Sequence, residues 1–413
     1  MRYFLPDWDD RVDPRFDFHF DLAAVGRNPQ KDDIYAHEYF GDDQCYDGIL
    51  VSRSALVQSG SKRKEVDRIG LRGFLRLPRR FELMGDCGAF GYVKEPTPIY
   101  ETPEVLDFYQ RVGVDYGVSV DHIIFPAFPD QRQFRYDLTI DNAIEFLERH
   151  RAGSYSFTPV GAVQGWDVPS YADAARRLAA AGYDMLAVGG LVRSRTREIL
   201  AIAQGVAAAV GPDVRLHLLG VARDEIIPDL ARLGIFSFDS ASPMRTAWMS
   251  ATKNYLAGDT YYTAIRIPSS APETKGVRGT NILTRADTNS TYAEVQNLEG
   301  AALRAVRGYA RREVSLDDAM VAIEAYDFEQ TRSTEVPGSR ARRMLNYRRT
   351  LTDRPWTKCD CKVCKDVGVE VVIFRRNDRN RRRGFHNVRD FYMNLKDRER
   401  RVRDRPQQTS LGL

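Results

Sequence analysis

The feature that most constrains the fold is a regular alternation of short apolar runs with longer amphipathic segments. The apolar runs lie at 81–85, 118–120, 160–163, 185–188, 216–219 and 235–238. The segments between them read as helices, and several end at a glycine, as at Gly182, Gly211 and Gly234. Alternation of this kind, with a repeat of about 25 residues, is typical of βαβ units and a parallel sheet.

Two architectures accommodate such a sheet: an open doubly wound sheet and a closed barrel. Both collect ligands at the carboxyl ends of their strands. No Gly-rich phosphate loop follows the first apolar run, at 81–85. We therefore predict an α/β protein with a (β/α)8 barrel of the TIM type.

Polar residues follow four of the apolar runs: Asp86, Asp121, Gln164 and Asp239. Strand ends of one barrel meet on one face, so we expect these side chains to converge. Two carboxylates in one site allow one to attack as a nucleophile and the other, with a raised pKa, to protonate a leaving group. That division of labour serves glycosyl transfer through a covalent intermediate. The alternative is that each aspartate caps the following helix.

Three of the five cysteines are clustered as C-x-C-x-x-C: Cys359, Cys361 and Cys364. His386 follows the cluster at a distance that a folded subdomain can close. Three thiolates and one imidazole form a closed tetrahedral shell for Zn²⁺, which is the composition of a structural site. We predict a structural zinc ion here; a redox cluster or coincidental cysteines are the alternatives. His122 and His217 are expected to be structural histidines.

The net charge of +4 is unevenly distributed. Residues 375–405 contain twelve arginines and one lysine against five acidic residues, and residues 340–349 contain five more arginines. A basic segment on a mildly acidic body indicates an anion-binding face, with nucleic acid as the leading candidate. A solvated, Arg-rich helix is the alternative. No membrane-spanning run and no secretory signal are evident, so we expect a cytoplasmic protein.

These patterns predict three parts. Residues 1–75, which are Asp-rich and irregular, are expected to form an N-terminal extension that packs on the barrel. Residues 76–340 would form the barrel, and residues 341–413 the zinc-binding subdomain with a basic C-terminal helix. The segment 266–295 holds several Pro and Gly residues and reads as a long loop, a lid or a nucleic-acid-contacting insertion.

Six segments, in order, resemble the motifs of the tRNA-guanine transglycosylases. They are GDCGAF at 85–90, GAVQG at 161–165, AVGGL at 187–191, LHLLGV at 216–221, GIFSFD at 234–239 followed by PMR at 243–245, and the C-x-C-x-x-C with its histidine. Cys87 and Ala89 replace a serine and a glycine of the family's first motif. The opening residues 1–14 and the region of Asp86 resemble the DpdA branch of that superfamily, the DNA deazapurine transglycosylases of phages and bacterial modification islands.

The resemblance implies a role for each motif residue. Asp239 would be the nucleophile at the sugar C1′, and Asp86 the general acid and base. Asp121 would read the guanine N1 and N2 edge. Further contacts to the base and to a nearby phosphate would come from Phe90, Gln164, Gly189, Gly190, Leu191 and Arg245. Phe90 would stack on the base, and Arg245 would contact the phosphate; the alternatives are a core position and a surface ion pair.

The implied reaction exchanges guanine in DNA for a 7-deazaguanine base such as 7-cyano-7-deazaguanine. A tRNA-guanine transglycosylase is the first alternative, and an inactive nucleic-acid-binding barrel is the second. Either polymer must present an extruded guanine. The arginines of 340–349 and 375–405 would then contact phosphates. A homodimer, or partner modification proteins, would be compatible with the resemblance.

Overall fold

The computed structural model describes residues 1–6, 9–57, 59–125, 127–221, 223–270, 290–331 and 336–404. The chain divides into two compact units. The first comprises residues 1–9, 46–241 and the chain from Tyr392 onward, and the second comprises residues 10–45 and 242–391.

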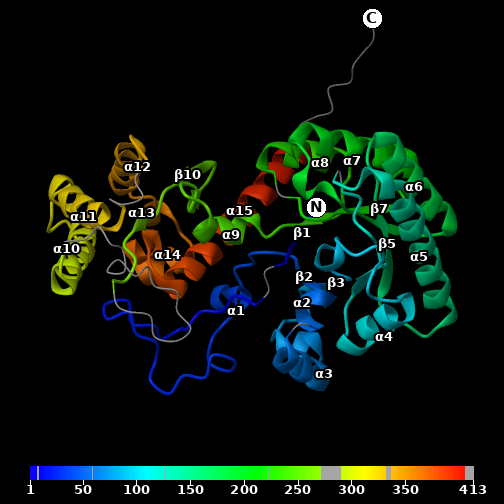
Figure 1. Ribbon diagram of the computed structural model, residues 1–413, viewed down its shortest axis with the longest axis horizontal. Coiled ribbons are helices and arrows are strands. Elements are labelled where there is room, and N and C mark those ends of the chain that lie inside the picture. Colours follow the sequence, from blue (N-terminus) through cyan, green and yellow to red (C-terminus); the bar gives the residue numbers. More distant parts are fainter. Residues whose placement is uncertain are drawn as a thin grey trace, which may run out of the picture. The chain divides into compact units, whose positions relative to one another are not determined.

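The first unit is built on a closed barrel of eight parallel strands in sequential order, as predicted. Closure comes from β1, which pairs with β2 on one side and with β8 on the other. The strands are β1 (Arg2–Leu5), β2 (Gly48–Ser52), β3 (Glu82–Asp86), β4 (Tyr116–Val118), β5 (Thr158–Val163), β6 (Met185–Val188), β7 (Arg215–Leu218) and β8 (Ser237–Asp239). Figure 1 shows this unit in blue to green.

Alternate residues of the strands fill the inside of the barrel, because successive side chains of a strand point to opposite faces. β5 contributes Val160 and Ala162, and β6 contributes Met185 and Ala187. The rest of this buried cluster is Phe4, Leu50, Met84, Tyr116 and Val118. The interior is therefore mostly a packed apolar core, and a site is expected at the carboxyl ends of the strands.

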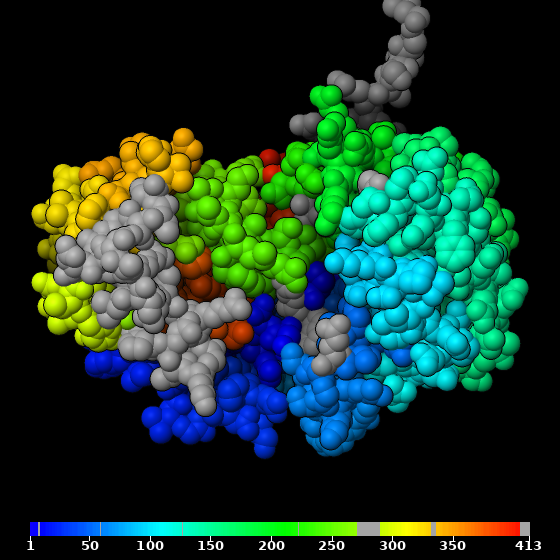
Figure 2. Space-filling model, viewed as in Figure 1, coloured from blue at the N-terminus to red at the C-terminus, as the bar shows by residue number. Residues whose placement is uncertain are grey.

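Helices connect the strands and cover the outside of the barrel. They are α2 (Arg53–Val57), α3 (Gly60–Phe74), α4 (Thr102–Val112), α5 (Arg132–Ala152), α6 (Val168–Ala181), α7 (Thr196–Val210) and α8 (Ile227–Arg232). Figure 2 shows α4 and α5, in cyan, at the surface of this unit. The bounds of α6 follow from its sequence: the Asp167 side chain caps the N-terminus through the Ser170 N–H, and Gly182 ends it with φ 103°.

The predicted N-terminal extension at residues 1–75 is wrong. β1 and β2 are barrel strands, and the eight strands end at Asp239. β1 is only four residues long and lies beside an Asp-rich segment, so its apolar pattern is too short to detect in the sequence. The barrel strands therefore span residues 2–239, whereas the predicted barrel was residues 76–340.

The second unit contains helices and small sheets. Its elements are α1 (Ala36–Phe40), α9 (Ser242–Met249), β9 (Tyr255–Ala257), β10 (Thr260–Tyr262), β11 (Ile265–Arg266), α10 (Tyr292–Ala310), α11 (Leu316–Thr331), α12 (Ser339–Asp353), α13 (Pro355–Lys358), α14 (Lys362–Val367) and β12 (Ile373–Phe374). α15 (Arg376–Asp404) begins in this unit and ends in the first. Of the predicted loop at 266–295, residues 271–289 lie outside the described residues.

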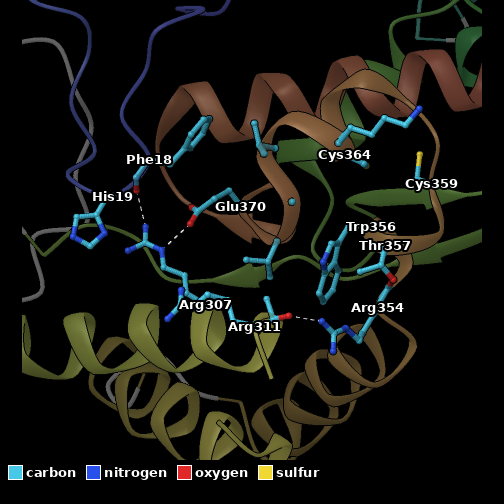
Figure 3. A pocket seen from close by; sticks show the side chains of 15 residues that line it. Phe18, His19, Arg307, Arg311, Arg354, Trp356, Thr357, Cys359, Cys364 and Glu370 are labelled. Carbon is cyan, nitrogen blue, oxygen red and sulfur yellow. Dashed lines mark hydrogen bonds and ion pairs between the residues drawn. The ribbon is translucent and has the colours of Figure 1, made fainter. Parts of the chain in front are cut away.

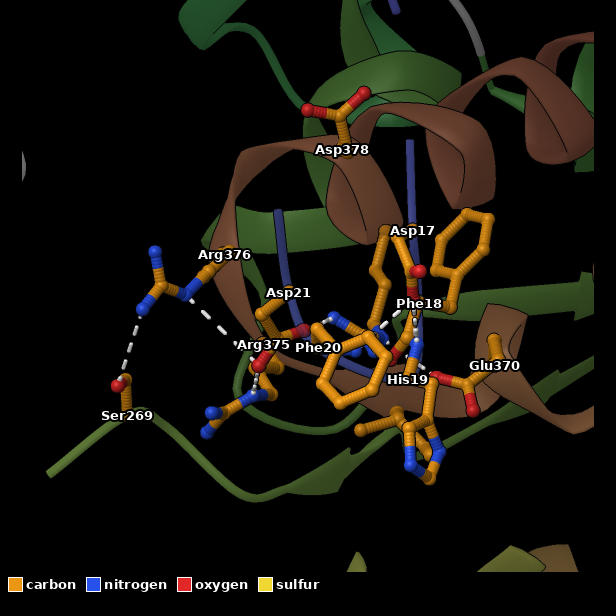
Figure 4. Close-up of polar contacts among 12 residues, drawn as sticks. Asp17, Phe18, His19, Phe20, Asp21, Ser269, Glu370, Arg375, Arg376 and Asp378 are labelled. Atoms are coloured by element: carbon orange, nitrogen blue, oxygen red, sulfur yellow. Dashed lines mark hydrogen bonds and ion pairs between the residues drawn. The ribbon is translucent and has the colours of Figure 1, made fainter. Parts of the chain in front are cut away.

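The basic C-terminal helix exists, but its first half is not the predicted phosphate-binding surface. Arg375 and Arg379 are buried, and both bind Asp21 from the N-terminal part of this unit. Arg375 also donates to Glu299 Oε1 at 2.6 Å, and Arg379 Nε to Glu370 Oε2 at 2.7 Å. Figure 4 shows Arg375 and Arg376 turned toward Asp21. Although burial raises the pKa of Asp21, these arginines hold it below its usual value.

Arg375 directly precedes α15, and two further arginines within the helix are also internal. Arg382 donates to Asp378 Oδ1 at 3.0 Å. Arg383 is fully buried and donates to the main-chain carbonyls of Ala247, Val371 and Ile373. Burial lowers the pKa of Arg383 to about 9. Several arginines of this basic segment therefore form internal hydrogen bonds and ion pairs that stabilise the second unit. The number of arginines in the sequence does not distinguish this structural role from a binding surface.

No helix among the described ranges combines the length and the apolar character that crossing a membrane requires.

Candidate active site

The carboxyl ends of the barrel strands carry the polar residues that the sequence singled out. Asp86 is the last residue of β3 and Asp239 the last of β8. Gln164 directly follows β5, and Asp121 lies three residues beyond the end of β4, at Val118. Parallel strands of a barrel all end on one face, so one fold rule places the four residues at the same end.

Asp86 has the environment of a carboxylic acid that keeps its proton near neutrality. Burial, together with the charges of Asp121 and Asp239, raises the pKa of Asp86 to about 7, although N–H groups of the next turn oppose the shift. Asp239 is 6% exposed and lies close enough for its charge to act on Asp86. A carboxyl group with a raised pKa beside a second carboxyl group is an arrangement that can combine acid catalysis with a separate nucleophile.

Asp239 is held by hydrogen bonds to one of its two oxygens. Oδ1 accepts from the Gly220 N–H at 2.9 Å and from His217 Nε2 at 3.2 Å. His217 Nδ1 is 2.8 Å from Ser237 Oγ, so the hydroxyl can donate to the ring and leave the proton on Nε2. Among the described residues both bonds go to Oδ1, and Oδ2 accepts neither of them.

His217 and Ser237 are site residues that the sequence analysis missed. Both are fully buried and lie opposite one another on β7 and β8. The sequence does carry a signal. His217 stands between Leu216 and Leu218, and a lone polar residue in a barrel strand has to find a partner inside the barrel. We expected His217 to be a hydrogen-bonded structural residue, but the sequence did not indicate that its partner is Asp239.

Asp121 is bound on both of its oxygens. Cys87 Sγ lies 3.1 Å from Oδ1, and Gln164 Nε2 donates to Oδ2 at 2.6 Å. Burial raises the pKa of Asp121, and these two hydrogen bonds oppose the shift. Cys87 also lies 3.0 Å from the hydroxyl of Tyr92, which donates to the Asp121 carbonyl at 2.9 Å. The residue that replaces the family's serine therefore helps to hold Asp121; burial raises the pKa of its thiol well above the usual value.

The Gly189–Gly190 pair allows the backbone to approach Gln164. A Cβ on Gly189 would come within 2.3 Å of Gln164 Nε2, and a Cβ on Gly190 within 2.8 Å of Gln164 Oε1. Gly190 also has φ 75°, which disfavours any other residue. Gln164 Oε1 is buried and has no hydrogen-bond partner in the described part of the chain. An orphaned acceptor at the strand ends marks the point where a ligand with N–H groups would bind.

The remaining predicted contacts are placed as follows. Leu191 is fully buried at the start of a short 3-10 helix. Phe90 lies in another short 3-10 helix (Ala89–Tyr92) and is 57% exposed, so it is not a core residue. Arg245 lies on α9 and belongs to the second unit, whereas the other predicted contact residues belong to the first. The structure thus groups Asp86, Asp121, Gln164 and Asp239 most directly.

The four predicted metal ligands converge in the second unit. The Sγ atoms of Cys359, Cys361 and Cys364 lie 3.6, 3.4 and 3.5 Å from His386 Nδ1. A tetrahedral Zn²⁺ ion with ordinary Zn–S and Zn–N bonds separates sulfur from nitrogen by about 3.6 Å. His386 Nε2 donates to the Leu256 carbonyl at 2.6 Å, which directs the Nδ1 lone pair at the thiols. This donor set could hold a metal ion.

The comparisons with known proteins agree with this geometry. The queuine tRNA-ribosyltransferase family matches residues 97–266. A DNA-guanine transglycosylase of Salmonella montevideo is 36% identical over 416 residues, which cover 96% of each chain.

More distant relatives match over part of their length. The tRNA-guanine(15) transglycosylases of Pyrococcus abyssi and Haloferax volcanii are each 25% identical, over 48% and 47% of this chain. The chain spans only 34% and 38% of these two archaeal proteins. The Salmonella montevideo protein, by contrast, matches this chain over nearly its whole length. The chain therefore belongs to the tRNA-guanine transglycosylase superfamily, in its DpdA branch, and is a guanine transglycosylase.

Proposed function

We propose that this protein exchanges guanine in DNA for a 7-deazaguanine base, through a covalent intermediate on Asp239. The observation that carries the proposal is the pair of carboxylates at the strand ends. Asp239 has one oxygen held and one available, and the raised pKa of Asp86 supplies a proton near neutral pH. The full-length likeness to a protein named DNA-guanine transglycosylase supports DNA as the polymer.

In the first half of the proposed reaction, Asp239 Oδ2 attacks C1′ of the extruded nucleotide. The bond from C1′ to guanine N9 breaks, and Asp86 gives its proton to the departing base. In the second half, ionised Asp86 removes the N9 proton of the incoming base. N9 then attacks C1′, and the bond to Asp239 breaks, which regenerates both carboxyl groups.

Recognition of the base falls to Asp121 and Gln164 in this proposal. The Asp121 carboxylate accepts from the guanine N1–H and N2–H groups. As the Gln164 amide is oriented, Nε2 is committed to Asp121 and only Oε1 is unpartnered. A contact from Nε2 to guanine O6 therefore requires the base to displace Gln164 from Asp121. In the absence of a base, the bond from Gln164 keeps the buried carboxylate of Asp121 paired.

A zinc ion would be structural in this protein. Its four ligands would be Cys359, Cys361, Cys364 and His386, a complete tetrahedral set with no open position for substrate. The ion would supply the fixed junction between α14, α15 and the β9 strand, and the chemistry of base exchange would remain with the carboxylates.

The experiment is base exchange with the purified full chain. Labelled guanine and 7-cyano-7-deazaguanine are offered to duplex DNA and, separately, to unmodified tRNA, with wild-type protein and Asp239→Asn. We expect label in DNA, with loss of at least about a thousandfold in Asp239→Asn because the nucleophile is removed. Label in tRNA alone would overturn the choice of polymer, and label in neither polymer would favour an inactive nucleic-acid-binding barrel.

A further inference from the structure

A basic groove lies in the second unit between the β9–β10 hairpin and α12. It has a volume of about 510 Å³. Figure 1 shows α12 beside β10, and the Thr350 hydroxyl donates to the Thr263 carbonyl at 2.8 Å, which fixes the helix to the end of the hairpin. The groove is therefore built from two elements that are tied together by a buried hydrogen bond.

Cations dominate its lining. Lys253, Arg342 and Arg349 line it together with a single carboxylate, Asp259. All three cations are exposed. In the described residues neither Lys253 nor Arg342 has a carboxylate partner. Arg349 has only a loose one, Asp353 at 3.7 Å. Within the described ranges, the groove therefore carries more positive charge than its nearby carboxylates balance.

The helix side of the groove has a regular spacing. Arg342, Asn346 and Arg349 recur at intervals of four and three residues, so they form one stripe of α12. The neighbouring stripe, with Met344, Tyr347 and Leu351, is buried and anchors the helix. Because the apolar stripe of α12 is buried, the polar stripe lies at the surface, where it lines the groove beside the hairpin.

Aromatic rings are interleaved with the cations. Lys253 Nζ lies 5.8 Å from the ring centre of Tyr261, and the Arg349 guanidinium lies 5.0 Å from that of Tyr262. The Tyr262 hydroxyl donates to Asp353 at 3.0 Å, which fixes that ring. Cations over half-buried tyrosines, with amide and hydroxyl groups between them, suit a sugar–phosphate backbone.

A second cavity in this unit, about 660 Å³ in volume, makes the contrast clear (Figure 3). It also contains arginines, but they are already bound. Arg307 Nε donates to Glu370 at 2.7 Å, Arg354 to the Ala310 carbonyl at 2.5 Å and Arg311 to Glu313 at 2.7 Å. Of these two cavities, the groove beside α12 is thus the one whose cations are available to an anionic strand.

We propose that the groove formed by Lys253, Tyr261, Tyr262, Arg342, Asn346 and Arg349 binds the sugar–phosphate backbone of the DNA substrate. The inference rests on the proposed function, because it takes DNA as the polymer. Its contacts are independent of base sequence, so the groove positions DNA and does not select the guanine.

The test compares DNA binding by wild-type protein with Lys253→Gln/Arg342→Gln/Arg349→Gln, using a fluorescent guanine-containing duplex over a series of salt concentrations. Loss of three phosphate contacts should reduce the slope of log K against log salt by about 2.7. It should weaken binding roughly 10- to 100-fold at low salt. The DNA concentration for half-maximal exchange should rise by the same factor.

Arg348→Gln is the matched control. It lies on the same helix and is 45% exposed, but its guanidinium pairs with Asp317 at 2.8 Å and does not line the groove. It should keep the wild-type affinity and salt slope. Circular dichroism and thermal unfolding of all variants establish that the fold is intact.

The outcomes separate this inference from the proposed function. Wild-type exchange in DNA with an unchanged slope in the triple variant would overturn the groove and leave the function standing. A wild-type protein that binds unmodified tRNA but not DNA would overturn both. Loss of DNA affinity in the triple variant, with Asp239→Asn still binding as wild type and losing only exchange, would support both.

Discussion

A single proton on Asp86 connects the stability of the site with its chemistry. The folded pKa of about 7 lies above the ordinary value of 3.8, because burial and two neighbouring carboxylates disfavour the charge. The folded state therefore binds this proton more tightly than the unfolded state. The free energy of unfolding should fall as pH rises from about 4 to about 7, and then level off.

Asp86→Asn removes this pH dependence. We expect the variant to be more stable than wild type at pH 8 by on the order of 1–3 kcal/mol, a difference that disappears below about pH 4. Exchange should be lost at every pH, whereas wild-type exchange should decline above about pH 7 as the acid ionises. Urea unfolding over a pH series measures the first effect. The exposed Asp213→Asn is the control, and equal stability of Asp86→Asn and wild type at pH 8 would contradict the assignment.

His217 offers a second prediction, about a positioning residue. Its Nε2 is one of two donors that hold Asp239 Oδ1. His217→Phe should lower kcat about 10- to 100-fold and change KM little, because the lost bond acts on the nucleophile and not on the bound base.

His217→Gln tests whether the effect comes from the donor. A glutamine amide can reach toward the same carboxylate, so it should restore part of kcat, whereas a packing defect would leave both variants equally impaired. Steady-state kinetics with DNA as the varied substrate separates the two parameters. An equal fall in kcat for both variants, with a lower midpoint of thermal unfolding, would reduce His217 to a structural role.

Among the elements, α14 and α15 show how a short motif organises a larger region. Cys361 and Cys364 lie at the start of α14, and His386 lies on α15. His386 donates to the carbonyl of Leu256 in β9, and its ring stacks on Tyr255 with centres 4.0 Å apart. The cluster thus joins two neighbouring helices to a hairpin that lies about a hundred residues earlier in the sequence.

Removal of the metal should loosen that junction. We expect Cys361→Ser to purify without bound zinc and to lose on the order of 5 kcal/mol of stability, since binding free energy at such a site is folding free energy. Elemental analysis and thermal unfolding with and without a chelator measure both. Cys45→Ser, at a buried cysteine outside the cluster, should retain the metal. Zinc retained in full by Cys361→Ser would refute the ligand set.

For the whole molecule, the sequence predicted the parts of the fold whose pattern repeats. Strands β3 to β8 were found because their apolar runs recur in alternation with helical segments. β1 and β2 were both missed, because the short runs Arg2–Leu5 and Gly48–Ser52 lie in a segment that otherwise reads as irregular. Closure of the barrel is a non-local pairing of β1 with β8, and no window of sequence contains both strands.

The same distinction holds for the site and the charges. Asp86, Asp121, Gln164 and Asp239 were identifiable because they follow apolar runs and because the surrounding segments resemble family motifs. The hydrogen bonds around them depend on pairs across strands, such as His217 with Asp239, and those need coordinates. Likewise Arg383 and the arginines that bind Asp21 look like a surface in the sequence, and only their partners show that they are internal.

Barrel closure gives a prediction that distinguishes an N-terminal strand from a dispensable extension. Phe4 is fully buried inside the barrel, where it packs edge-on against Tyr116 and His217. Phe4→Ala should lower the free energy of unfolding by about 3–5 kcal/mol, through lost burial and the cavity left behind. Phe20→Ala, at a side chain that is 67% exposed within the same first 75 residues, should change it by less than about 0.5 kcal/mol.

A milder variant keeps the test informative if Phe4→Ala does not fold. The Tyr3 hydroxyl donates to the carbonyl of Ser240, directly after Asp239, at 2.7 Å. Tyr3→Phe removes the hydroxyl and keeps the ring, so it should cost about 1–2 kcal/mol and leave the fold intact. Because β1 pairs with β8 through Phe4 and Asp239, it should also lower the rate of exchange. Unfolding curves that coincide for wild type, Tyr3→Phe and Phe4→Ala would mean that residues 1–75 are an appendage. A graded loss would mean that β8, the strand of Asp239, is held in place by the first strand of the chain.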